Sequence, residues 1–139
     1  AEPADAGARA IDAVIRRLVE RNYLSDARFA TDYTRIRKEG GKLGRRRVQQ
    51  DLAARGVPHE LAGAALGEAY DGIDEVALAR QFCERKRIQR PADQKDSART
   101  MGRLLRAGFS PGTVFKVLRQ WGAPLDDLPD EIAAGFEPD

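Results

Sequence analysis

Apolar side chains recur along this sequence at the three- and four-residue spacing of one helix face. The clearest sets are Phe29, Tyr33 and Ile36; Val48 and Leu52; Leu61, Ala65 and Leu66; Met101, Leu104 and Leu105; and Val114, Val117 and Leu118. A half-buried strand would instead place apolar residues at every second position, and no stretch does so convincingly. The pattern therefore predicts an all-α protein.

The ends of the helices are marked by characteristic residues. Asn22, Gly56 and Gly108 are each followed by an apolar residue, which is a common helix stop because this position favours the left-handed conformation. Ser25 and Ser110 are suited to cap the start of a helix. These signals predict seven helices, near residues 7–21, 25–39, 44–55, 59–70, 73–89, 96–107 and 111–121.

The sequence also contains an internal repeat. A shift of 52 residues superimposes four pairs: Leu52 and Leu104, Gly56 and Gly108, Val57 and Phe109, and Leu66 and Leu118. The simplest explanation is a unit of three helices repeated in tandem. Stacked units of this kind form an elongated, curved array of helices without one deep core.

The repeat predicts how the chain is divided. We expect the last helix of an incomplete first repeat at residues 1–22, a second three-helix repeat at 23–71 and a third at 72–122. Residues 123–139 contain six acidic and no basic side chains. This composition is typical of a flexible acidic tail.

The net charge of the chain is only +2, but the charges are strongly segregated. Residues 35–55 carry eight basic and two acidic side chains, whereas residues 56–79 carry five acidic and none that is basic. Residues 80–106 carry nine basic and three acidic side chains. Such separation indicates a binding surface, although solvated helix faces that happen to cluster are the alternative explanation.

The candidate binding surface lies on the predicted 25–39 and 44–55 helices and the loop between them. It consists of seven basic residues: Arg28, Arg35, Lys38, Lys42, Arg45, Arg46 and Arg47. A surface of this kind suits DNA phosphates, because basic side chains release condensed counterions. It equally suits an acidic groove on another protein. Aromatic residues are scarce, so base stacking is not expected.

The segment at 44–47, "GRRR", places three of these arginines at a predicted helix start, where the macrodipole favours negative charge. The shift of 52 places this segment on residues 96–99, and there Asp96 or Ser97 is expected to cap the helix. The earlier copy replaces this favourable start with cations. The contrast predicts a helix N-terminus that, with its arginines, binds an anion from outside.

Catalytic and metal-binding patterns are absent from the sequence. His59 is the only histidine and Cys83 the only cysteine, which excludes an internal disulfide and leaves no catalytic triad or zinc spacing. The glycines match no phosphate-binding fingerprint. We therefore expect no enzyme and no cofactor. A single thiol and the lack of a long apolar run are compatible with a cytoplasmic protein.

A helix-turn-helix DNA reader is the main alternative function. The stretch "RRRVQQDLAARGVPHELAGAAL" contains a helix, a glycine turn and a second helix. The second helix offers His59, Glu60, Glu68 and alanines, with no Arg, Lys, Asn or Gln to meet base edges. This argues against sequence-specific readout of DNA. A purely structural scaffold is a third possibility.

The run "RNYLSDARFATDYTRIRKEGGKLGRRRVQQDLAARGVPHELAGAAL" at 21–66 resembles the RecX family, bacterial regulators of the RecA recombinase. The matching segments are Tyr23-Leu24-Ser25-Asp26, Arg28-Phe29-Ala30, Tyr33, Arg35, residues 44–52, Arg55-Gly56-Val57 and residues 60–66. The later "LLRAGFSPGTVFKVL" is similar to the family's last repeat, so the resemblance covers about residues 8–121. One departure is Arg45, where family members often have proline.

The resemblance implies tandem three-helix repeats, usually three, so this chain is expected to lack two helices at its N-terminus. It implies a protein that binds RecA filaments on single-stranded DNA, lying in the filament groove. It further implies that the protein restrains ATP hydrolysis, strand exchange and SOS-related co-protease activity, and promotes filament loss. The expected partners are this filament and DNA itself, contacted directly through its phosphates; we expect a monomer without membrane contact.

Overall fold

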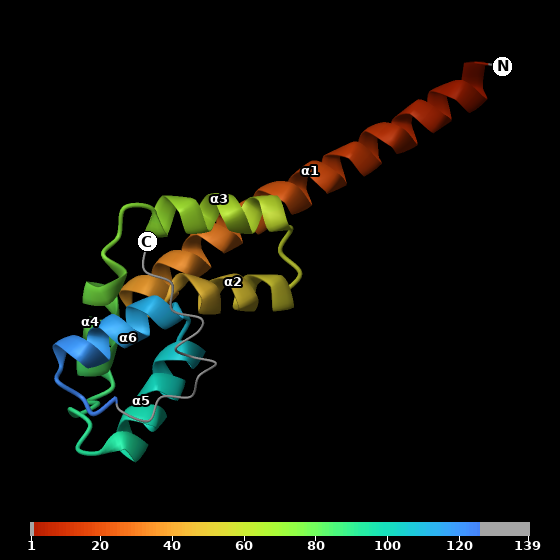
Figure 1. The fold of residues 1–139 in the computed structure, drawn as a ribbon. Coiled ribbons are helices and arrows are strands. Elements are labelled where there is room, and N and C mark those ends of the chain that lie inside the picture. The colour runs from red at the N-terminus through yellow and green to blue at the C-terminus, as the bar shows by residue number, and fades with distance from the viewer. Residues whose placement is uncertain (1, 126–139) are drawn as a thin grey trace.

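The computed structural model describes residues 2–125, with side chains from residue 6 onward (Figure 1). Its six helices are α1 (Glu2–Glu39), α2 (Arg45–Ala54), α3 (His59–Tyr70), α4 (Glu75–Arg85), α5 (Gln94–Arg106) and α6 (Pro111–Gln120). No strand occurs within these residues. The prediction of an all-α protein built from three-helix units is confirmed.

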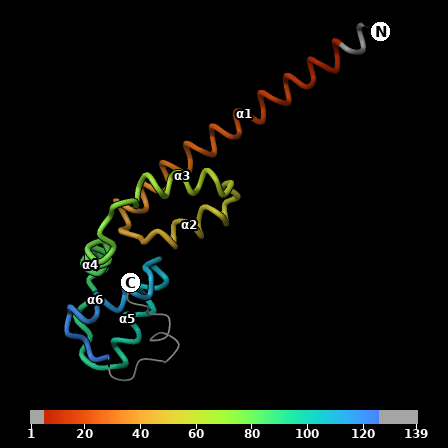
Figure 2. The backbone as a smooth tube through the Cα atoms, turned by 45° about the horizontal axis from the view of Figure 1, so that its top comes forward, coloured from red at the N-terminus to blue at the C-terminus, as the bar shows by residue number. Residues whose placement is uncertain are grey.

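The helices form two groups of three that follow one another along a bent path (Figure 2). The C-terminal part of α1 packs with α2 and α3, and α6 packs with α4 and α5. The N-terminal part of α1 extends away from both groups (Figure 1). A helix of this length, 38 residues, spans about 57 Å at 1.5 Å per residue, so the molecule is elongated.

The two groups correspond through the 52-residue shift. His59 and Pro111, the first residues of α3 and α6, are related by it. Three superimposed pairs are buried in the two groups: Leu52 and Leu104, Val57 and Phe109, and Leu66 and Leu118. Gly56 and Gly108 both adopt a positive φ, of 81° and 102°. The predicted helix stops at these two glycines are therefore confirmed, as is the cap at Ser110, which accepts a hydrogen bond from the Thr113 N–H.

The predicted helices at 7–21 and 25–39 are a single helix, so the stop at Asn22 and the cap at Ser25 are wrong. The sequence between residues 8 and 39 contains neither glycine nor proline, and Asn and Ser inside a helix cost little. Residues 6–25 are exposed over their whole length. Because no other described element packs there, nothing forces the chain to turn.

Two further helix boundaries differ from the prediction. α4 ends at Arg85 rather than near residue 89, because Arg87 adopts the left-handed conformation with a φ of 56°. The sequence gives no sign of this end, since glycine normally takes that position. α5 begins one turn before Asp96 and Ser97; its cap is Asp93, which accepts a hydrogen bond from the Asp96 N–H at 2.8 Å.

The expected acidic tail begins inside the described part of the chain. Ala123 is buried, and its N–H donates to the Leu118 carbonyl at 3.0 Å. Leu125 packs against the same core. These first residues of the segment therefore belong to the folded unit, and residues 126–139, where the flexibility was predicted, lie outside the described residues.

Candidate nucleic-acid and partner-binding site

The start of α2 is docked against the end of α5. The Gly44 N–H donates to the Ala107 carbonyl at 2.8 Å, and the Arg46 N–H donates to the Gly108 carbonyl at 3.3 Å. A Cβ atom added at Gly44 would lie 2.4 Å from the Gly108 oxygen. The two backbones approach so closely that only glycine fits at this contact, which we call the Gly44–Gly108 contact.

This contact corrects the prediction of an anion site at the start of α2. The carbonyl groups at the C-terminal end of α5 already accept from N–H groups at the N-terminal end of α2. The positive pole of α2 thus meets the negative pole of α5, and two of the N–H groups at the start of α2 are paired. Gly44 is also buried and makes no side-chain cap. The start of α2 is therefore partly covered by the end of α5, which disfavours the predicted anion site.

Two of the seven predicted basic residues are held against the end of α3. The Lys38 Nζ donates to the Ala69 carbonyl at 2.6 Å. The Arg45 guanidinium forms an ion pair with Asp71 at 3.2 Å. Lys42 lies between the two groups at a φ of 55° and lines a shallow cleft that includes Asp74. Lys38 and Arg45 are thus paired with acceptors of the protein itself.

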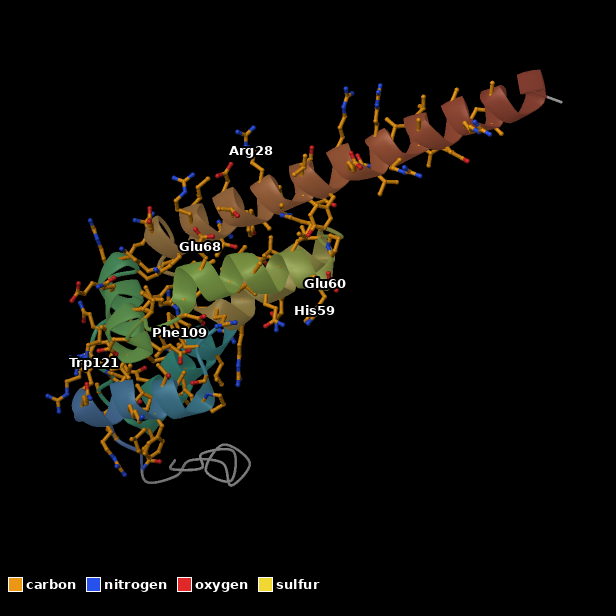
Figure 3. The ribbon with its side chains drawn as sticks, turned by 90° about the horizontal axis from the view of Figure 1, so that it is seen from above. Arg28, His59, Glu60, Glu68, Phe109 and Trp121 are labelled. Atoms are coloured by element: carbon orange, nitrogen blue, oxygen red, sulfur yellow. The ribbon has the colours of Figure 1, made fainter. Side chains whose placement is uncertain are left out.

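Arg28 and Arg35 lie on the outer face of α1. In Figure 3, Arg28 points away from α3, on the side of α1 opposite His59 and Glu60. Arg35 is seven residues later, about two turns, and forms an exposed ion pair with Asp32 at 3.3 Å. This face carries positive charge that is open to solvent.

Arg46 and Arg47 differ in their surroundings. Arg46 is exposed, and its side chain makes no hydrogen bond or ion pair among the described residues. Arg47 is half-buried; its Nε lies 3.2 Å from Asp51, and its Nη1 donates to the Arg106 carbonyl at 3.1 Å. Arg46 is thus available to a partner, whereas Arg47 joins the two helix groups.

The structure therefore does not gather the seven residues on one face. Arg28 and Arg35 occupy the outer side of α1, and Lys38 and Arg45 face α3. Arg47 instead lines a basic cleft between the two groups, together with four cations that the sequence did not single out: Arg37, Lys86, Arg103 and Arg106. The basic composition of residues 80–106 was visible in the sequence, but its position next to α2 was not.

The exposed surface of α3 carries no base-reading side chain. His59 and Glu60 at its start and Glu68 nearer its end are exposed to solvent, on different sides of the helix (Figure 3). The two carboxylates would repel phosphates, and none of these three residues is a usual partner of guanine or adenine edges. The geometry gives no support to the helix-turn-helix alternative.

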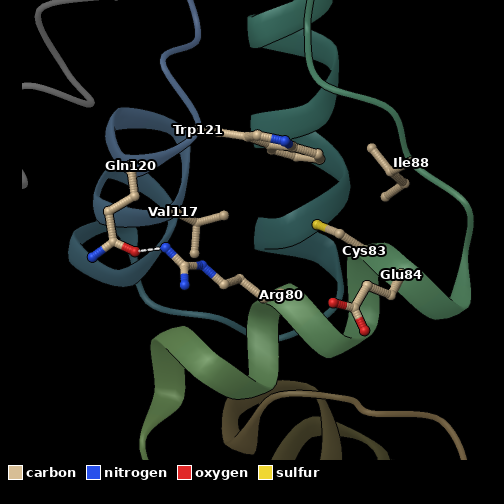
Figure 4. Close-up of a pocket in the computed structure, with 7 residues that line it drawn as sticks. All are labelled: Arg80, Cys83, Glu84, Ile88, Val117, Gln120 and Trp121. Atoms are coloured by element: carbon tan, nitrogen blue, oxygen red, sulfur yellow. Dashed lines mark hydrogen bonds between the residues drawn. The ribbon is translucent and has the colours of Figure 1, made fainter.

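A second cavity, of about 250 Å³, lies between α4 and α6 (Figure 4). Arg80 donates a hydrogen bond to Gln120 on one side, and Trp121 covers the other. Cys83 is buried in its wall. Burial raises the pKa of the Cys83 thiol, and Arg103 partly opposes this rise. A raised pKa leaves less thiolate at neutral pH, which disfavours a nucleophilic role for Cys83.

Metal and membrane features are absent from the part of the chain that the structure describes. No three His, Cys, Asp or Glu side chains come together there in a way that could hold a metal ion. None of the helices in residues 2–125, including the long α1, is apolar enough to cross a membrane. The seven predicted site residues supply positive charge and hydrogen-bond donors.

Comparisons with known proteins agree with the resemblance found in the sequence. A family model described as "RecX, second three-helix domain" matches residues 25–66, which run from the middle of α1 into α3. No solved structure matches the chain.

Three curated relatives carry the name "Regulatory protein RecX". The protein of Leptothrix cholodnii is 33% identical over 78% of this chain and 67% of its own length. The protein of Chromobacterium violaceum is 32% identical over 85% and 72%, and that of Serratia proteamaculans is 34% identical over 86% and 69%. These names describe regulators rather than enzymes. The chain therefore belongs to the RecX family of regulatory proteins.

Proposed function

We propose that this protein binds RecA filaments on single-stranded DNA and restrains RecA ATP hydrolysis, strand exchange and co-protease activity during recombination and SOS repair. The observation that carries this proposal is the similarity, over most of the chain, to proteins named regulatory protein RecX. The protein acts as a cytoplasmic monomer and needs no cofactor.

The exposed cations of α1 and α2 support a filament contact. Arg28, Arg35 and Arg46 are all exposed to solvent, and a RecA filament on DNA contains phosphates that such side chains attract. Arg46 is the best candidate for a direct contact, because its side chain has no partner among the described residues. It also lies on the far side of α2 from Val48 and Leu52, which are buried.

A first repeat that ends with residues 1–22 belongs to the same proposal. Ile11, Ile15 and Leu18 lie close together on one side of α1 by helical spacing, and each is more than 50% exposed. A helix of a three-helix unit would bury such a stripe. This supports residues 1–22 as the last helix of a first repeat, followed by repeats at 23–71 and 72–122.

Charge reversal at Arg46 tests the proposed contact. Labelled Arg46→Glu and wild-type protein are titrated with preassembled RecA filaments on single-stranded DNA. We expect the variant to bind about tenfold more weakly, which corresponds to about 1.4 kcal/mol. Stability should not fall, because the wild-type side chain makes no hydrogen bond or ion pair that is lost and an acidic residue is favourable in the first turn of a helix.

Lys95→Glu is the matched control. Lys95 is also exposed, and its replacement by glutamate changes the net charge by the same amount. It lies in the first turn of α5, where an acidic residue is favourable. It should bind filaments as wild type does. Equal binding of Arg46→Glu and wild type would remove Arg46 from the contact, and a wild type that does not bind filaments would contradict the proposed function.

A further inference from the structure

A cleft of about 310 Å³ opens between the two helix groups, and we call it the inter-repeat cleft. Five basic side chains line it: Arg37, Arg47, Lys86, Arg103 and Arg106. They come from the last turn of α1, the first turn of α2, the end of α4 and the last turn of α5. Leu43 and Phe82 form its apolar part, and no acidic side chain lines it.

The positive charge of the cleft is only partly balanced by the protein. Arg47 pairs with Asp51 at 3.2 Å. Lys86, Arg103 and Arg106 are exposed and make no side-chain hydrogen bond or ion pair within residues 2–125. The C-terminal ends of α1 and α4 each contribute the equivalent of about half a negative charge, whereas the end of α5 is already paired with the start of α2. Together with Asp51, these groups leave an excess of about three positive charges against the five cations.

Arg37 adds a second, independent observation. Its Nε is buried and has no hydrogen-bond partner in the structure. The Tyr33 ring lies 5.7 Å from its guanidinium carbon, which stabilises the cation but supplies no acceptor. Buried donors are nearly always satisfied in folded proteins. An oxyanion in the cleft would give the Arg37 guanidinium the acceptor that the protein does not provide.

We propose that the inter-repeat cleft binds a phosphate group, supplied either by the backbone of a nucleic-acid strand or by a free phosphate compound. Four of the five cations are arginines, whose planar fork matches the oxygens of phosphate. The excess charge exceeds that of a single carboxylate. The volume is at the lower end of small-ligand sites, enough for one phosphate and its attached sugar against Leu43 and Phe82.

This site is distinct from the proposed RecA contact at Arg46 and is tested without RecA. The test variant is Lys86→Gln with Arg103→Gln, which removes two cleft cations that are exposed and unpaired. The control is Arg85→Gln with Lys95→Gln, which removes two exposed cations of α4 and α5 outside the cleft. Should the test variant melt below wild type, Arg106→Gln alone allows the same comparison.

The first measurement is binding to an oligothymidylate over a series of salt concentrations. The test variant should bind about tenfold more weakly at low salt, and its plot of log affinity against log salt should be shallower by about one unit. The control should lose less than about threefold. This result assigns the site to a nucleic-acid strand.

The second measurement is the melting temperature in inorganic phosphate compared with chloride at equal ionic strength. A rise for wild type and control that is absent in the test variant, together with equal oligothymidylate binding, assigns the site to a free phosphate compound. If neither measurement separates the test variant from the control, the proposal is overturned. It is also overturned if polyglutamate competes as well as the oligothymidylate, since the cleft then binds acidic polypeptide.

Discussion

Arg46 and Arg47 are neighbours in the sequence, yet they meet different surroundings. Successive residues of a helix point about 100° apart, so Arg46 projects from α2 while Arg47 reaches Asp51 and the carbonyl of Arg106. Asp51 also accepts a hydrogen bond from Tyr33 at 2.9 Å. Replacing Arg47 would therefore disturb the fold as well as any binding. At the scale of single residues, Arg46 is the position that reports on binding alone.

Tyr70 allows a test of the packing between α3 and the loop after α1. Its hydroxyl donates to the Leu43 carbonyl at 2.7 Å, and the side chain is buried. Burial raises the pKa of Tyr70 well above its ordinary value, with a smaller opposing effect of Arg45. The folded protein thus holds this proton more tightly than the unfolded chain. Its contribution to stability is complete below the ordinary tyrosine pKa of 10.0 and is lost as the pH rises towards the folded value.

Tyr70→Phe should lower the free energy of unfolding by about 1 kcal/mol at neutral pH, because the hydrogen bond to Leu43 is lost. At a pH above the ordinary tyrosine pKa, the difference in the free energy of unfolding between wild type and variant should shrink. Wild type loses stability there as its unfolded chain ionises at Tyr70, whereas the variant has no hydroxyl to ionise at this position. Urea unfolding at several pH values measures both effects. Tyr23→Phe, at an exposed position, is the control. A difference that stays constant at alkaline pH would contradict the assignment.

At the scale of helices, the Gly44–Gly108 contact joins the two groups end to end. A Cβ added at Gly108 would also lie 2.4 Å from the Arg47 nitrogen, at a φ of 102° that favours glycine. The arginines at the start of α2 are compatible with its positive pole because the carbonyls of α5 lie against it. The Arg47 side chain donates to the carbonyl of Arg106, the last residue of α5.

Gly44→Ala should therefore destabilise the protein by about 1–3 kcal/mol, the usual cost of forcing an extra carbon into a packed contact. Gly63→Ala is the matched control. A Cβ at Gly63 meets nothing within 4 Å, and the residue is exposed inside α3. The control should be more stable than wild type by about 0.5–1 kcal/mol. Urea unfolding of both variants measures these changes in the free energy of unfolding. A Gly44→Ala variant as stable as wild type would show that the two backbones do not approach closely at Gly44.

The sequence predicts those helix ends that depend on local chemistry. Gly56, Gly108 and Ser110 end or begin helices where expected. The end of α4 was missed because Arg87, rather than a glycine, takes the left-handed conformation. The continuity of α1 through Asn22 was missed because that residue ends a helix only if a packing partner requires a turn.

The candidate site was less predictable than the fold. The seven predicted cations were selected by their proximity in the sequence, and the structure distributes them over several faces. The inter-repeat cleft combines Arg37 with Arg106, which are 69 positions apart in the numbering. Only the docking of α5 onto α2 brings them together. A repeat of 52 residues predicts that two similar units exist, but it does not specify the angle at which they meet.

At the scale of the whole molecule, the elongated path of two helix groups and a projecting α1 (Figures 1 and 2) presents separate cationic regions. Arg28 and Arg35 lie along α1, Arg46 lies on α2, and the inter-repeat cleft lies between the groups. Spaced contacts of this kind suit a long polyanionic partner better than a small compact one. This is consistent with a regulator that lies along a filament.

The central claim is that the protein restrains RecA on single-stranded DNA. The most direct test is the steady-state rate of ATP hydrolysis by RecA filaments, titrated with this chain. We predict that the rate falls with added protein to a low plateau, and that the curve for Arg46→Glu is displaced to higher concentration while that for Lys95→Glu is not. An unchanged rate of ATP hydrolysis, at concentrations where the chain saturates the filaments, would contradict the account.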